Sequence, residues 1–219
     1  IKELDNLPLM TDPFKQAAMR ILTSVAYAAY TAVPKLFPLM VFKMVLLSIK
    51  HGNALESPFA YSLYGLVLCG KLGDIDTGYQ FGMLALRTVE RLRAKAFEAR
   101  TMYIVNGLIK HWQRPVREIL SPLLEAYQRG LESGNLEYAA FPLYTYTYYS
   151  FLCGKELTKL EPEMTSYHEA ISQLKQETIL RRYQIYWQVV LNLRGHTDNP
   201  RRLVGEVFNE EKMLIRYLE

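Results

Sequence analysis

Two short Gly-Asx turns constrain the fold of this chain more than any other feature. Gly73-Asp74 and Gly134-Asn135 each follow one amphipathic stretch and open another. Glycine ends a helix readily because it accepts the left-handed backbone conformation, and Asp at the next position caps the helix that follows. Helix pairs then begin near residues 57, 95, 135 and 177, about 40 residues apart. The pattern predicts an all-α fold of stacked helix hairpins, an α-α superhelix.

The first 55 residues carry separate start and stop signals. Asp12-Pro13 is a helix start, because Asp accepts hydrogen bonds from free N–H groups and Pro loses nothing at the first helical position. We expect one helix to about residue 32 and a second, almost wholly apolar helix over residues 35–50, ending before Gly52. Residues 1–55 are therefore predicted to form an apolar helix hairpin.

Composition indicates a well-packed protein, because 50% of the 219 residues are hydrophobic and 22% are charged. The net charge is +4, and basic residues alternate with acidic ones, so nucleic-acid binding is not indicated. Cys69 and Cys153 lie in apolar stretches without disulfide or metal-site spacing, which favours reduced thiols and a cytoplasmic location. Pro34 and Pro38 interrupt the apolar passage 21–49, so no transmembrane segment is expected.

The region around the first turn resembles the tetratricopeptide repeat. Residues 71–74 (KLGD) match its inter-helix turn, and the small residues Gly78 and Ala85 follow where the two helices of a repeat cross. Small side chains are needed there because the two backbones approach closely. The spacing of about 40 residues exceeds the usual 34 of this family, so the resemblance is to the wider tetratricopeptide-like class.

A second resemblance is to the helical-repeat segment of large bacterial signalling proteins that combine a serine/threonine kinase, a predicted ATPase, a GAF domain and a histidine kinase. The segments that carry it are residues 111–115 (HWQRP), 123–127 (LLEAY), 130–139 (GLESGNLEYA) and 151–157 (FLCGKEL). The resemblance covers about residues 50–195 and implies a linking or regulatory module, with phosphotransfer and ATP hydrolysis performed by other domains. The chain contains no phosphate-loop or kinase motif.

These observations predict one helical-repeat domain over residues 1–219, cut from a longer polypeptide. Its parts are the hairpin of residues 1–55, tetratricopeptide-like hairpins over residues 56–195, and a terminal helix within residues 196–219 that begins near Arg201 and runs to about Leu218.

A cluster of tyrosines provides the candidate site. Five of the sixteen tyrosines lie between residues 138 and 149. We expect Tyr146 and Tyr149 to face a concave groove, together with Pro142 and Ala139, because tyrosine offers apolar area and a hydroxyl at low entropic cost. The alternative is that these tyrosines fill contacts between helices. No catalytic residue, cofactor or metal site is expected, because the four histidines are far apart and carry no metal-ligand spacing.

The preferred functional interpretation is a non-catalytic interaction or signal-relay scaffold within a multidomain bacterial sensor kinase. Its expected partners are neighbouring domains of the same polypeptide or a separate peptide or protein. The alternative is a small-molecule-sensing domain or an all-helical enzyme, with a pocket between the N-terminal hairpin and the repeats.

Overall fold

The computed structural model describes residues 1–197 and 199–213, and this part of the chain is helical and contains no β-strand. The all-α prediction is confirmed. Two isolated β-bridges, Leu9–Asn53 and Val204–Asn209, are present outside the helices. The α-helices are α1 (Lys2–Asp5), α2 (Pro13–Ala32), α3 (Leu36–His51), α4 (Ser57–Val67), α5 (Ile75–Leu92), α6 (Lys95–Tyr103), α7 (Leu120–Glu132), α8 (Leu136–Leu152), α9 (Leu157–Gln173) and α10 (Glu177–Leu193).

Short non-α segments extend three of these helices. The π-helical segments η1 (Leu68–Leu72) and η2 (Ile104–Ile109) continue α4 and α6. The 3-10 segments η3 (Lys110–Trp112) and η4 (Val116–Ile119) lead from η2 into α7. The arms that contain α4, α6 and α7 are therefore composites of helix types, although the sequence pattern reads as a continuous helix in each.

The helix ends form as the turn residues predict. Asp12 accepts hydrogen bonds from the backbone N–H groups of Phe14 (2.8 Å) and Lys15 (3.2 Å) at the start of α2. Gly73 takes the left-handed conformation with φ of 72° and ends η1, and Asp74 accepts a 3.2 Å bond from the Thr77 N–H at the start of α5. These bonds satisfy backbone donors that a helix start leaves free.

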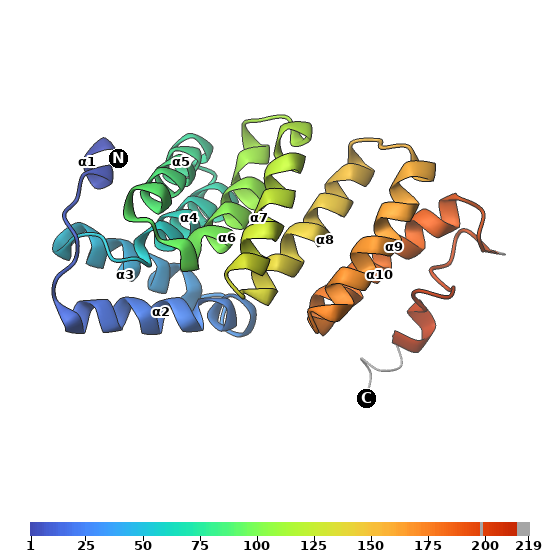
Figure 1. The fold of residues 1–219 in the computed structure, drawn as a ribbon, viewed down its shortest axis with the longest axis horizontal. Coiled ribbons are helices and arrows are strands. Elements are labelled where there is room, and N and C mark those ends of the chain that lie inside the picture. The colour runs from blue at the N-terminus through green and yellow to red at the C-terminus, as the bar shows by residue number, and fades with distance from the viewer. Residues whose placement is uncertain (198, 214–219) are drawn as a thin grey trace.

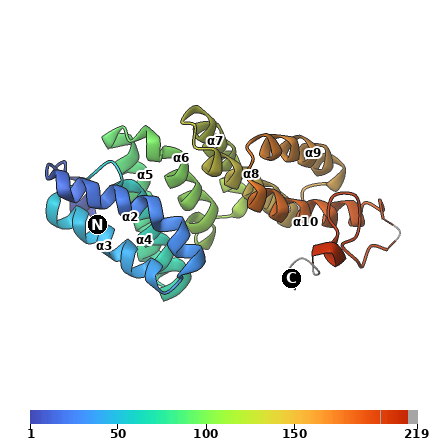
Figure 2. The same cartoon turned by 90° about the horizontal axis from the view of Figure 1, so that it is seen from below.

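The helices from α4 to α10 follow one another along the long axis of the molecule (Figure 1). α4, α6, α8 and α10 form an inner row in which each helix contacts the next, and α5, α7 and α9 pack against neighbours in this row. In Figure 2, α7 and α9 lie along one edge and α8 and α10 along the other. The hairpin of α2 and α3 contacts α4 at the N-terminal end of the row.

Close helix crossing occurs where small residues meet. A Cβ atom built on Gly130 of α7 would lie 2.7 Å from the Cα of Ala139 in α8, so neither backbone has room for a larger residue at position 130. Small residues at such crossings let two helices approach and bury their remaining apolar side chains.

The predicted terminal helix is wrong over residues 201–209. This segment forms turns and the Val204–Asn209 bridge, and helical structure begins only at residue 210. The Gln188 side chain of α10 accepts hydrogen bonds from the N–H groups of Val207 (3.3 Å) and Phe208 (3.2 Å), which ties the segment to α10 in a non-helical conformation. Asn209 then caps the N–H groups of Glu211 and Lys212 at the helix start. The predicted residues 214–218 lie outside the described part.

Of the helices in the described part of the chain, none combines the length and apolar character that crossing a bilayer requires. Cys69 is buried, Cys153 is partly buried, and both are free thiols.

Candidate functional site

A cavity of about 310 Å³ lies against the inner row of helices, where the N-terminal hairpin meets it. Its walls come from α2, α3, α4, the α6–η2 segment, α8 and α10. We call it the aromatic cavity, because most of its surface is formed by rings. The lining residues are Ala26, Tyr27, Tyr30, Phe37, Phe59, Leu63, Leu66, Tyr103, Ile104, Leu108, Tyr138, Phe141, Tyr144, Thr145, Tyr148, Tyr149 and Arg182.

Helix α8 contributes the largest share of this wall through one face. Tyr138, Phe141, Thr145 and Tyr148 follow one another at intervals of three or four residues, which places them on one side of a helix. Tyr144 lies next to this stripe and also reaches the cavity. The face of α8 that carries these residues is thus turned toward α2, α4 and α6.

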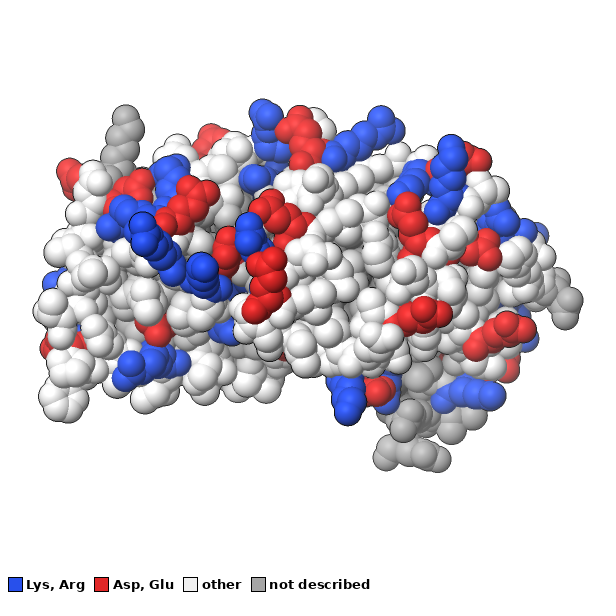
Figure 3. All heavy atoms as spheres, in the orientation of Figure 1, with Lys and Arg blue, Asp and Glu red and all other residues white. Residues whose placement is uncertain are grey.

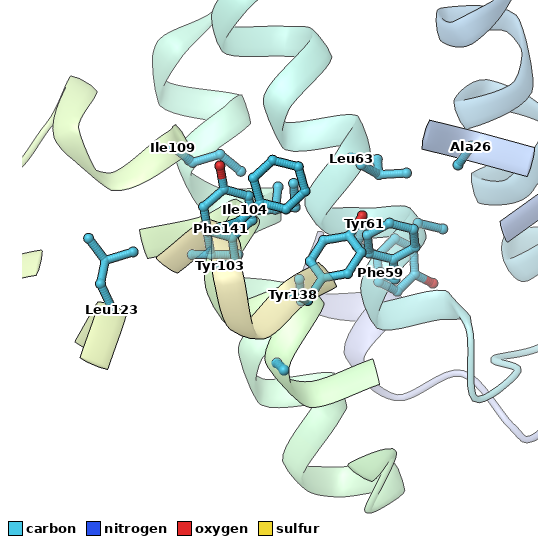
Figure 4. Packing of buried hydrophobic residues seen from close by; sticks show 14 of the residues in the cluster. Ala26, Phe59, Tyr61, Leu63, Tyr103, Ile104, Ile109, Leu123, Tyr138 and Phe141 are labelled. Carbon is cyan, nitrogen blue, oxygen red and sulfur yellow. The ribbon is translucent and has the colours of Figure 1, made fainter. Parts of the chain in front are cut away.

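The rings of the wall are packed against one another. Tyr103 stacks on Phe141 with ring centres 5.2 Å apart and planes 13° apart (Figure 4). Tyr27 meets Phe141 edge-on at 5.9 Å. Phe59 of α4 meets Tyr138 edge-on at 6.1 Å. Such pairs stabilise by about 0.5–1.5 kcal/mol each beyond their buried area, so the rings of the wall stabilise one another's positions.

Hydroxyl groups supply the polar character of the cavity. The Tyr149 hydroxyl donates a 2.7 Å hydrogen bond to the carbonyl oxygen of Gly107. Burial raises the pKa of Tyr103, Tyr144 and Tyr149 to about 12, because the phenolate would lose its hydration there. These side chains are therefore neutral near pH 7. The hydroxyls of Tyr103 and Tyr144 can donate as well as accept hydrogen bonds, whereas that of Tyr149 already donates to Gly107 and can only accept.

Arg182 of α10 is the charged residue of the lining. Its side chain is exposed, it forms no ion pair within the described chain, and its charge lowers the pKa of Tyr103 and Tyr144 against the larger effect of burial. A guanidinium in this position favours a carboxylate or another acceptor of a bound molecule, since it carries five donors in a planar fork.

The expected site residues separate into two groups. Tyr149 lines the aromatic cavity and is 9% exposed. Tyr146 does not line the cavity, and its ring meets Tyr167 of α9 edge-on at 5.7 Å. Ala139 is fully buried at the Gly130 crossing, and Pro142 is buried within α8. The expected placement of Tyr146, Pro142 and Ala139 on a groove is therefore corrected, because this stripe of α8 packs against other helices.

The Tyr146 environment is a small polar contact between α8 and the start of α9. Lys155 Nζ donates to both carboxylate oxygens of Glu163 at 2.7 Å and to the Tyr146 hydroxyl at 3.2 Å. The Tyr146 hydroxyl in turn lies 3.4 Å from Glu163. These contacts join two consecutive helices, as the alternative interpretation of the tyrosines predicted.

Sequence reasoning missed the cavity residues outside α8. Tyr27 and Tyr30 come from α2 and Tyr103 from the end of α6, so only tertiary packing brings them to Tyr138. A signal for the correct face of α8 was present in the stripe from Tyr138 to Tyr148. It was obscured because α8 is apolar on nearly every side.

Charges and metal-ligating residues are distributed over the rest of the molecule. On the face shown in Figure 3, Lys and Arg side chains lie among Asp and Glu side chains. In the described part of the chain, no group of three His, Cys, Asp or Glu residues is arranged to hold a metal ion.

No protein-family model matches the chain, and no curated protein matches it significantly in sequence.

Proposed function

We propose that this chain is a non-catalytic interaction module that binds a segment of a neighbouring domain or of a partner protein. The segment lies along the inner row of α4, α6, α8 and α10 and inserts an apolar side chain into the aromatic cavity. The cavity itself is the observation that supports this function, because rigid tyrosine-rich recesses are the places where binding energy concentrates in protein interfaces.

The polar groups of the cavity favour a peptide over a purely apolar ligand. Neutral tyrosine hydroxyls can bond to peptide carbonyl and N–H groups, and Arg182 at the exposed margin can bind an acidic side chain or a chain terminus. A segment with an aromatic or large aliphatic residue close to an acidic residue fits this arrangement.

The repeat architecture is part of the same proposal. We infer that α4–α5, α6–α7 and α8–α9 are tetratricopeptide-like repeats of an α-α superhelix. The inference is supported by the inner-row contacts and by small residues at the helix crossings. The cytoplasmic location rests on Cys69 and Cys153, which lack disulfide spacing, and the relay role within a bacterial sensor kinase rests on the sequence resemblance. In that role, a bound neighbouring domain alters kinase output when the hairpins shift against one another.

Selection from a displayed library of linear peptides tests the binding function. Selected peptides should share an aromatic or large aliphatic residue, and their affinity should fall at least about tenfold when Leu66→Trp fills the cavity from α4. Arg182→Glu should weaken peptides that carry an acidic residue, whereas Arg181→Glu, outside the cavity lining, should not. Failure to select any peptide, or equal binding to the Leu66→Trp variant, would contradict the proposal.

The relay role has its own test in the full-length parent protein. Deletion of residues 57–195 should change the autophosphorylation rate of the kinase, because the coupling element is removed. Unchanged output in response to stimulus would leave binding possible but refute the relay role.

A small-molecule site is the second candidate. It is favoured by the position of the cavity, which lies between the N-terminal hairpin and the helix row, and by its volume at the lower end of the range of about 300–1,000 Å³ typical of ligand pockets. A thermal-shift screen with metabolites and nucleotides distinguishes the candidates, since a ligand that binds only the folded state raises the melting temperature, and does so more the further its concentration exceeds its Kd.

A further inference from the structure

A second cavity, of about 390 Å³, lies beside the aromatic cavity and has a different chemical character. Tyr27 and Tyr138 belong to the walls of both cavities. We call this second cavity the Glu56 pocket. It is enclosed by α2, the turn before α4, α6 and α8, and its lining residues are Arg20, Thr23, Ser24, Tyr27, Glu56, Ala96, Phe97, Arg100, Glu137 and Tyr138.

Two acids and two bases line the Glu56 pocket without pairing. Glu56, Glu137, Arg20 and Arg100 form no ion pair with any residue in the described part of the chain, whereas elsewhere pairs such as Lys155–Glu163 close to 2.7 Å. Charged side chains that share a cavity without contact leave each charge partly unneutralised.

Glu56 is the most deeply placed of these groups. The residue is only 7% exposed, and no other side chain in the described chain donates a hydrogen bond to its carboxylate. Burial raises the pKa of Glu56, and this effect exceeds the opposite effects of its own backbone N–H and of Arg20. The ionised form of a carboxyl group buried in this way is stabilised strongly when a cationic group of a bound molecule donates a hydrogen bond to it.

Arg100 of α6 is held in a fixed position by the side chains around it. Its guanidinium lies over the rings of Phe97 (5.2 Å) and Tyr138 (5.1 Å), and 5.4 Å from the ring of Phe59. The Asn135 amide oxygen accepts two bonds from it, at 2.7 and 3.2 Å. This orientation is favoured over a 3.5 Å bond from the Tyr138 N–H, because the guanidinium bonds are shorter and charge-assisted.

Each acid of the pocket has one base within electrostatic reach but not in contact. Arg20 lowers the pKa of Glu56 and Arg100 lowers the pKa of Glu137, yet burial dominates and both carboxyl pKa values are raised. The pocket therefore offers, within one cavity, a carboxylate to which no other side chain donates and guanidinium groups that form no ion pair. A molecule that carries an ammonium and a carboxylate complements both kinds of group.

We propose that the Glu56 pocket binds a small zwitterion of the α-amino acid class. Its ammonium group donates hydrogen bonds to Glu56, and its carboxylate accepts hydrogen bonds from Arg20 and Arg100. The ligand side chain lies toward Tyr27 and Tyr138, the two rings shared with the aromatic cavity. This site goes beyond the interaction function and does not depend on it.

Isothermal titration of the purified chain with each standard L-amino acid, one at a time, tests the site. At least one should bind with a Kd below about 1 mM, and its N-acetyl derivative and its carboxamide should each bind at least about tenfold more weakly. Failure of every amino acid to bind at about 10 mM, or undiminished binding of both derivatives, would overturn the proposal.

Matched variants connect this binding to the pocket. Glu56→Gln keeps the shape of the side chain and should weaken the amino acid at least about tenfold, as should Arg20→Met, whose side chain is exposed and unpaired. Glu90→Gln on the exposed side of α5 is the control and should bind as the unaltered chain does. If both Glu56→Gln and Arg20→Met bound the amino acid with the affinity of the unaltered chain, the ligand would lie elsewhere and the site would be refuted.

Discussion

Gly65 of α4 and Gly78 of α5 meet backbone to backbone where the two helices cross. A Cβ atom on Gly65 would lie 2.7 Å from the Gly78 carbonyl oxygen, and one on Gly78 would lie 2.8 Å from the Gly65 carbonyl oxygen. Real Cβ atoms do not approach backbone this closely, so the crossing requires glycine on both helices. The sequence pattern predicts Gly78 at such a crossing, and the structure identifies Gly65 as its partner.

Gly78→Leu should therefore destabilise the fold by overpacking, by about 1–3 kcal/mol or more in the free energy of unfolding. Urea denaturation measures the change. Gly70→Ala is the matched control, because a Cβ at Gly70 meets no atom within 4 Å, and it should leave stability unchanged or slightly increased. An unchanged unfolding midpoint for Gly78→Leu would mean that the α4–α5 crossing is wider than described.

The buried hydroxyl of Tyr149 gives a second prediction. Tyr149→Phe removes the bond to the Gly107 carbonyl and should cost about 0.5–1.5 kcal/mol, whereas Tyr149→Ala also removes a buried ring and should cost about 3–5 kcal/mol. Tyr30→Phe is the control, because the Tyr30 side chain is 52% exposed. Equal unfolding midpoints for Tyr149→Ala and the unaltered chain would show that this ring is not part of the packed interior.

Local turn chemistry explains why so many helix ends could be predicted from the sequence. Asp12-Pro13 and Gly73-Asp74 act through their own backbone conformations and caps, so no distant residue is needed. The helix predicted over residues 201–209 is wrong because the Gln188 side chain, about twenty residues away in sequence, binds the backbone N–H groups of Val207 and Phe208 in a non-helical conformation.

The face of α8 was misassigned for a different physical reason. Its apolar residues surround the helix, so periodicity does not distinguish the side facing the cavity from the side facing α7 and α9. The choice is made by packing: Gly130 admits only the small Ala139 on one side, and Tyr103 stacks on Phe141 on the other. The Glu56 pocket escaped sequence analysis because its charged groups come from residues as far apart as Arg20 and Glu137.

Alkaline pH should destabilise the fold through its buried tyrosines. Burial raises the pKa of Tyr61, Tyr103, Tyr144 and Tyr149 to about 12. In the unfolded chain these groups lose their protons near pH 10, so between about pH 10 and 12 the unfolded state binds fewer protons and stability falls as pH rises. Denaturation at a series of pH values measures the slope. Tyr103→Phe should make the slope shallower, and a slope unchanged by this substitution would contradict the assignment.

Glu56→Gln should leave the fold at least as stable as the unaltered chain near pH 7. The raised pKa of Glu56 means that the folded state holds its proton more tightly than the unfolded state does. The folded form is therefore penalised once the carboxyl ionises, which happens as pH rises above the ordinary value near 4.5. Glutamine removes this penalty, so the gain in unfolding free energy should be largest near pH 7 and should shrink as the solution is acidified toward pH 4.

Denaturation of both chains at several pH values gives this difference, with Glu90→Gln as the control on an exposed surface. A large loss of stability at pH 7 would mean that the Glu56 carboxylate is satisfied within the folded chain, and the pocket would then lack the unpaired group on which zwitterion binding depends.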